Sequence, residues 1–323
     1  ARALIAIDQR ELAALSRRLR AAGWPDDTPA QVVSRAGWPD QLRSDHTVAS
    51  LGGAAMLHAG RPSVVTIGAG AAPLAPAFDL HVGANGYAWW YLDALSDDGE
   101  HGLTIIAFIG SVFSPYYAQA RRGGRAADPL NHCAVNVALY GRDGHRWAMT
   151  ERGRGRVSRD ASHLQIGPSG LHWSGNALHI VLDELAVPWP ARIRGTVSVQ
   201  VPRRFDHPVA LAPGHRWCPI APAARVDVAL GGLRWSGPGY LDANHGDAPL
   251  ERAFRRWDWS RAQLSGGDSV VLYDVDRIGL EPLRLGLRFD MRRGQVCAID
   301  PPPAARLPAT LWRIARGGRT DAG

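Results

Sequence analysis

Short apolar runs bounded by turn-forming residues dominate the chain from residue 78 onward. Such runs span 103–109, 134–140, 178–182, 193–201, 225–230, 269–273 and 283–289. In the stretch 192–199, the apolar Ile193, Val197 and Val199 alternate with arginine, threonine and serine, which is the period of a half-buried strand. Strands separated by such turns predict a sandwich or barrel rather than βαβ units.

The first 72 residues show a different pattern of apolar and polar positions. Asp8 and Glu11 resemble a capping box, and leucines at helical spacing follow until Gly23, so we expect a basic amphipathic helix there. An ordinary surface helix and a membrane-surface helix both fit this pattern. The Gly-, Ala- and Pro-rich stretch 68–76 predicts a linker.

Length, charge and cysteine content narrow the class of protein. A chain of 323 residues suggests about two domains, and the net charge of +7 fits weak attraction to anionic lipid. Arginines do not cluster with aromatic residues as in a nucleic-acid binder, so no nucleic-acid partner is expected. The isolated Cys133, Cys218 and Cys297 form no CxxC pair, and no apolar run is long enough for a spanning helix. We therefore expect a protein that is soluble or sits on a membrane surface.

Three stretches carry a family resemblance. They are 86–117, beginning Gly-Tyr-Ala-Trp-Trp-Tyr-Leu-Asp; 131–152, beginning Asn-His-Cys-Ala-Val-Asn; and 215–261, which contains His-Arg-Trp, Gly-Pro-Gly-Tyr-Leu-Asp-Ala-Asn-His-Gly and Trp-Asp-Trp-Ser-Arg. Over residues 78–290 the chain resembles the carotenoid 1,2-hydratase (hydroxyneurosporene synthase) family.

The resemblance implies a mainly β fold with two consecutive lipocalin-like β-barrel domains. We expect a helical or poorly ordered segment at 1–72, a first barrel at 73–205 and a second at 206–323. The family resemblance also implies hydration of the terminal C1=C2 double bond of an acyclic carotenoid of the lycopene or neurosporene type. The expected partners are that carotenoid and water, without a cofactor. The expected location is cytoplasmic and peripheral to the inner or intracytoplasmic membrane.

Two short pairs offer the groups that this chemistry needs. An alkene is a poor base, so its protonation requires an acid kept neutral in an apolar pocket. His215 with Trp217, and Tyr240 with Asp242, each occupy positions i and i+2, which share one face of a strand. We expect both pairs to point into one barrel lumen.

The family motif associates these residues with catalysis. We assign Asp242 as the proton donor, His215 as the base or water-positioning group, Tyr240 as the residue that orients the acid, and Trp217 as the ring that stabilises the cation. The roles of acid and base are exchangeable at this point. Structural roles also remain open: Tyr240 as a barrel-closing aromatic in a turn, Asp242 as a turn cap, His215 as a loop histidine, and Trp217 as core.

The aromatic run that opens the first motif is a candidate substrate surface. Tyr87, Trp89 and Tyr91 alternate, so they share a face and could line a hydrophobic tunnel or belong to the core.

No other motif adds a site. His163, His172 and His179 are too dispersed in sequence to imply a metal site, and none is expected. The alternatives to a hydratase are a non-catalytic lipocalin-like binder of a lipophilic ligand and an isomerase or cyclase on the same fold.

Overall fold

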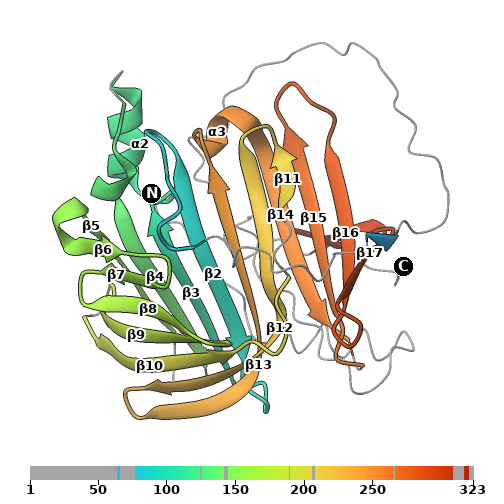
Figure 1. Ribbon diagram of the computed structural model, residues 1–323, viewed down its shortest axis with the longest axis horizontal. Helices are drawn as coiled ribbons and strands as arrows, with labels where there is room; N and C mark the ends of the chain where they lie inside the picture. The colour runs from blue at the N-terminus through green and yellow to red at the C-terminus, as the bar shows by residue number, and fades with distance from the viewer. Residues whose placement is uncertain are drawn as a thin grey trace. The chain divides into compact units, whose positions relative to one another are not determined.

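The computed structural model describes residues 64–65, 77–123, 126–141, 145–188, 190–205, 208–264, 266–307 and 316–319 (Figure 1). The expected N-terminal helix and the expected linker lie outside these residues. Contacts divide the chain into one unit of residues 69–253 and a second unit that combines residues 1–68 with 254–323.

The larger unit is built on one antiparallel sheet of twelve strands. Along the sheet the order is β5-β4-β3-β2-β13-β12-β10-β9-β8-β7-β6, and β11 pairs with β12. The strands are β2 (Tyr87–Leu95), β3 (His101–Ile109), β4 (Cys133–Gly141), β5 (Arg146–Arg152), β6 (Val157–Arg159), β7 (His163–Ile166), β8 (Ser169–Ser174), β9 (Ala177–Leu185), β10 (Arg192–Gln200), β11 (Val209–Ala212), β12 (His215–Leu230) and β13 (Leu233–Gly246).

This sheet curls into a nearly closed barrel. An isolated bridge joins Trp147 of β5 to Val187, just after β9, and the Val187 N–H donates to the Trp147 carbonyl at 2.8 Å. In Figure 1 the green strands β6 to β10 follow one another around this curve. The mainly β, barrel-like fold class is therefore confirmed.

Period-two patterning explains the buried side of the barrel. In β10, Ile193, Val197 and Val199 are buried, whereas Arg192 and Arg194 are exposed. Equivalent alternation around the sheet gathers one aliphatic core, whose burial is the main force that holds the curled sheet together, at roughly 25 cal/mol per Å² of apolar surface.

Two short helices complete the described part of this unit. They are α2 (Pro115–Arg122) and α3 (Leu250–Ala253), with single 3₁₀ turns at Pro129–Asn131 and Arg154–Arg156. Ser114 caps α2 by accepting from the Tyr117 N–H, and Pro115 occupies its first turn. That Ser-Pro pair is a helix-start pattern that the sequence interpretation missed. None of the helices in the described residues is long and apolar enough to cross a bilayer.

The smaller unit contains a five-stranded antiparallel sheet in the order β1-β17-β16-β15-β14 and a separate pair, β18 with β19. Its strands are β1 (Val64–Val65), β14 (Phe254–Gln263), β15 (Ser269–Arg277), β16 (Leu283–Asp290), β17 (Gln295–Ala298), β18 (Ala304–Leu307) and β19 (Arg316–Arg319).

The division between units falls at 253/254 rather than at the expected 205/206. The reason is strand pairing: β10 and β12, which lie on either side of 205/206, are hydrogen-bonded neighbours, with Thr196 opposite Ala229. A boundary at 205/206 would cut the sheet between paired strands.

Candidate active site

The four predicted catalytic side chains lie on one face of two neighbouring strands, β12 and β13. In the register of β12 and β13, Pro219 is opposite Asp242, Trp217 is opposite Asn244, and His215 is opposite Gly246. On the other side of β13, Asp242 is opposite Tyr91 of β2. Paired residues in an antiparallel sheet point to the same face, so His215, Trp217, Tyr240 and Asp242 share this face. We call it the site face.

The site face is opposite the aliphatic core of the barrel. Trp90, Leu92, Leu241 and Ala243 alternate with the site residues along β2 and β13, and they belong to the core cluster. The expectation that the site residues point into the barrel lumen is therefore wrong, because the alternate, apolar positions of these strands face the interior. The site residues are nonetheless buried: Asp242 is 3% exposed and His215 is 2% exposed.

One end of the site face is a carboxyl cluster of Trp217, Tyr240 and Asp242. The Trp217 Nε1–H and the Tyr240 hydroxyl both donate to Asp242 Oδ2, each at 2.8 Å. Burial raises the pKa of Asp242 to about 7, against the lowering effect of these two hydrogen bonds. Tyr240 and Asp242 lie within the continuous strand β13, so the alternative of a turn at this place is wrong.

The two donors give the two carboxyl oxygens different roles. Oδ2 accepts both hydrogen bonds, whereas Oδ1 is buried and has no hydrogen-bond partner. In a neutral carboxylic acid one oxygen carries the proton and the other keeps its acceptor capacity. This arrangement favours Oδ1 as the oxygen that carries the proton, because Oδ2 is already the acceptor. The acidic proton is then on Oδ1, the oxygen that has no hydrogen-bond partner in the protein.

A second buried carboxyl group lies close to this cluster and was missed in the sequence. Asp93 of β2 is opposite Tyr240 in the register and is buried. Its charge contributes, after burial, to the raised pKa of Asp242. Asp93 belongs to the motif that begins at Tyr87, and its i+2 spacing from Tyr91 was the available indication that it shares the face.

The other end of the site face is an imidazole cluster of Tyr87, His215 and Gly246. The Tyr87 hydroxyl and His215 Nδ1 are 2.9 Å apart, and the two rings stack with centroids 5.8 Å apart. Burial lowers the pKa of His215 against the opposing charge of Asp247, so the neutral imidazole is favoured. Burial also raises the pKa of Tyr87 well above its usual value, so this residue stays a neutral phenol.

Gly246 makes the close packing of this cluster possible. A Cβ atom at this position would lie 2.6 Å from His215 Nδ1 and 2.6 Å from the Tyr87 ring. Only glycine therefore lets the imidazole and the phenol approach each other over β13.

Asn244 lies between the two clusters on the same strand. It is 3% exposed, and its Oδ1 is buried without a hydrogen-bond partner. In the register it is opposite Trp217 on one side and Trp89 on the other. Buried polar atoms without partners are rare in folded proteins and need a specific explanation.

The three aromatic residues proposed as a substrate surface also belong to the site face. Tyr87, Trp89 and Tyr91 are opposite Gly246, Asn244 and Asp242 respectively. Tyr87 stacks on Trp89 with centroids 4.9 Å apart, and Tyr91 meets Tyr240 edge to face at 6.3 Å. They are therefore not part of the barrel core, and they connect the imidazole cluster to the carboxyl cluster.

The three histidines judged too dispersed in sequence are neighbours in space. His163, His172 and His179 lie side by side on β7, β8 and β9, with ring centroids 4.1 Å and 6.4 Å apart. The first two rings stack face to face at 15°, so their nitrogens do not converge on one point. Across the described part of the chain, no group of three or more His, Cys, Asp or Glu side chains could hold a metal ion.

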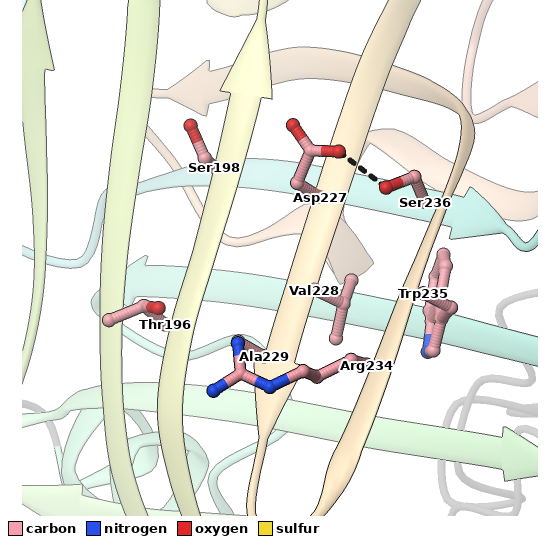
Figure 2. Close-up of a pocket in the computed structure, with 8 residues that line it drawn as sticks. All are labelled: Thr196, Ser198, Asp227, Val228, Ala229, Arg234, Trp235 and Ser236. Carbon is pink, nitrogen blue, oxygen red and sulfur yellow. Dashed lines mark hydrogen bonds between the residues drawn. The ribbon is translucent and has the colours of Figure 1, made fainter.

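A shallow pocket of about 400 Å³ lies elsewhere in the larger unit, over β10, β12 and β13 (Figure 2). Its lining includes polar and apolar side chains, and Asp227 accepts a hydrogen bond from Ser236 at 2.5 Å. None of the predicted catalytic residues lines it. It therefore offers no support for the predicted chemistry.

The fold and the site face define a class: a mainly β, barrel-like protein that buries a carboxyl group of raised pKa and an imidazole of lowered pKa on one face. The family model described as "Carotenoid hydratase CrtC" matches residues 105–323. The chain belongs to this carotenoid hydratase family.

Individual relatives agree with this assignment. An acyclic carotenoid 1,2-hydratase of Thiocapsa roseopersicina is 54% identical over 77% of this chain and 62% of its own length. The acyclic carotenoid 1,2-hydratase of Rubrivivax gelatinosus is 50% identical over 77% of this chain and 62% of its own length. That of Rhodobacter capsulatus is 42% identical over 68% of this chain and 77% of its own length. The chain thus spans less than two thirds of the length of the first two relatives.

A solved structure supports the fold. A crystal structure of a Nitrosomonas europaea protein, provisionally assigned as AttH, matches 75% of this chain and 82% of its own length with a TM-score of 0.50 and 14% identity.

Proposed function

We propose that this protein adds water across the terminal C1=C2 double bond of an acyclic carotenoid of the lycopene or neurosporene type and forms a tertiary 1-hydroxy product. The observation that carries the proposal is Asp242: a buried carboxyl group whose pKa is raised to about 7 and whose Oδ1 has no partner. The relatives named acyclic carotenoid 1,2-hydratase support the choice of substrate class.

The first step is protonation of the alkene. Asp242 Oδ1 gives its proton to C2, and the two alkene electrons form the new C–H bond, which leaves a tertiary cation at C1 and a carboxylate at Asp242. The Trp217 Nε1–H and the Tyr240 hydroxyl already donate to this carboxyl group, so they stabilise the negative charge as it develops. Their rings, with Tyr91, offer electron-rich faces to the cation, each contact contributing about 0.5–2 kcal/mol.

Capture of the cation is the second step. A water oxygen forms the C–O bond to C1, and His215 accepts a proton from that water because burial keeps its imidazole neutral. The proton then returns through solvent to the Asp242 carboxylate. Alkene plus water has become alcohol, and the protein ends the cycle unchanged.

This reaction transfers no electrons between protein and substrate. A proton donor and a proton acceptor therefore suffice, and we propose that the enzyme works without a cofactor. Tyr87, Trp89 and Tyr91 are proposed to hold the apolar polyene end along the site face.

The substrate suggests where the protein works. An acyclic carotenoid partitions into the apolar phase of a membrane. Hence we propose a cytoplasmic protein that contacts the inner or intracytoplasmic membrane peripherally, and its net charge of +7 would favour an anionic lipid surface.

A product assay tests the function. The purified protein is incubated with lycopene in detergent micelles, and the extract is analysed for a tertiary alcohol by liquid chromatography and mass spectrometry. We expect the mass of one added water per hydrated end. Binding of lycopene without a product would instead favour a lipocalin-like carrier, and an isomer of unchanged mass would favour an isomerase or cyclase.

A further inference from the structure

The proposed acid, Asp242, and the proposed base, His215, are too far apart to act on one double bond without a further group between them. His215 is opposite Gly246, four residues along β13 from Asp242. With a rise of about 3.3 Å per residue, the two backbone positions are roughly 13 Å apart along the strand. C1 and C2 are directly bonded, so the water that attacks C1 must be held near the carboxyl group.

Asn244 occupies the midpoint of that interval. It lies two residues, or about 7 Å, from Asp242 on one side and from Gly246 on the other. Its amide is on the site face, buried, and its Oδ1 lacks a partner, as does Asp242 Oδ1. These two unpartnered oxygens are neighbours on one face of one strand.

We propose that Asn244 binds the water that captures the carbocation. This inference rests on the proposed hydration and assigns a residue to its second step. Asn244 Oδ1 accepts one O–H of the water, and the imidazole of His215 takes the proton of the other O–H. The lone pair of the water oxygen then points away from both acceptors, toward C1 of a chain end whose C2 contacts Asp242.

An uncharged amide is suited to this position. A second ionised carboxylate here would raise the pKa of Asp242 further and would favour return of the proton. An apolar side chain would leave the water without a fixed orientation. The amide oxygen accepts a hydrogen bond but does not compete for the proton, because it is far less basic than imidazole.

The experiment separates protonation from water capture. Reactions are run in D₂O with the wild-type chain and Asn244→Leu, which keeps the side-chain size and removes both polar groups. Alcohol formation and deuterium in the recovered polyene are measured together by mass spectrometry. A cation that is not captured returns a proton to Asp242 and re-forms an alkene that carries deuterium.

For Asn244→Leu we expect alcohol formation to fall about 100-fold, a loss comparable to removing one preorganised polar contact at a reacting centre. Deuterium exchange into the polyene should continue at a rate near that of the wild type or above it. Asn244→Ser, which restores a hydroxyl acceptor, should recover part of the alcohol formation and provides a second variant if the leucine side chain disturbs folding.

The matched control is Asn136→Leu. Asn136 is a buried asparagine on β4, three strands from β13 in the same sheet, where its Nδ2 lies 3.9 Å from Met149 Sδ. This variant should keep the wild-type ratio between the rate of alcohol formation and the rate of deuterium exchange into the polyene.

Two results would overturn the role of Asn244: an unchanged rate of alcohol formation, or an equal loss of alcohol and exchange in both Asn244 variants. The proposed function itself fails differently, because the wild-type chain would then give neither alcohol nor exchange.

Discussion

The carboxyl cluster and the imidazole cluster are buried to nearly the same degree, yet burial has opposite consequences for their protons. Burial raises the pKa of Asp242 to about 7 and lowers the pKa of His215. In water near pH 7 an aspartate would be ionised and a histidine would be partly protonated. The shared desolvation thus favours the pair that hydration needs: an acid of which a substantial fraction keeps its proton near pH 7, and a base that lacks one.

The strongest test of this contrast removes the acid. Asp242→Asn keeps the size of the side chain and its acceptor for Trp217 and Tyr240, but it has no proton to give. We expect hydration to fall by at least about 10³-fold, within the range lost with a general acid. Product formation from lycopene measures this, and a circular dichroism spectrum like that of the wild type serves as the folding control. Near-normal turnover would remove Asp242 from the mechanism.

The same carboxyl group should make stability depend on pH. Its folded pKa of about 7 is above the unfolded value of 3.8, so the folded state holds the proton more strongly. The stabilisation is fully present below about pH 4 and is lost as pH rises through about 7, with a slope of up to about 1.4 kcal/mol per pH unit and a total on the order of 4 kcal/mol.

Chemical denaturation of the wild-type chain and of Asp242→Asn between pH 5 and pH 8 measures this effect. The difference in the free energy of unfolding between the two proteins should change in favour of Asp242→Asn as the pH rises. A difference that does not vary with pH would show that Asp242 has an ordinary pKa.

At the imidazole end, the sharpest perturbation is steric. In Gly246→Ala the new Cβ would meet His215 Nδ1 and the Tyr87 ring at 2.6 Å, so these groups must separate. We expect a loss of about 1–3 kcal/mol in the free energy of unfolding and a smaller loss of activity than in Asp242→Asn. Gly232→Ala is the control, because a Cβ there meets nothing within 4 Å. Equal stability of the two variants would contradict the close packing at Gly246.

A smaller effect is expected from loosening the carboxyl cluster. Trp217→Phe removes the Nε1–H that lowers the pKa of Asp242, so the pKa should rise and the alkaline limb of kcat/KM should move to higher pH. The rate at the optimum should fall about 10- to 100-fold, because a hydrogen bond to a group that becomes charged contributes about 1.5–3 kcal/mol. Trp90→Phe, on the core face of β2, should leave the limb in place. If the alkaline limb of kcat/KM does not move in Trp217→Phe, this hydrogen bond does not control the pKa of Asp242.

The sequence predicted much of this arrangement, and its failures have physical reasons. The i, i+2 spacing in His215–Trp217 and Tyr240–Asp242 was sufficient to predict a shared face. It could not predict that the aliphatic positions would take the barrel interior, because a period of two defines two faces without saying which is inside. Roles for the paired residues remain proposals.

Other misses depend on strand pairing between distant parts of the chain. Asp93 is brought to Tyr240 by the pairing of β2 with β13, and the three histidines are brought together by β7, β8 and β9. The pairing of β10 with β12 likewise moved the division between units away from 205/206. Register of this kind is set by the whole sheet and does not appear in the local pattern.

The protonation state of Asp242 near neutral pH is the property on which the acid role depends. Infrared difference spectroscopy between the wild-type chain and Asp242→Asn, recorded from pH 5 to pH 9, observes that carboxyl group directly. We expect the carbonyl band of a protonated carboxylic acid at low pH, which is replaced by carboxylate bands as the pH passes through about 7. Carboxylate bands already complete at pH 5 would contradict the account.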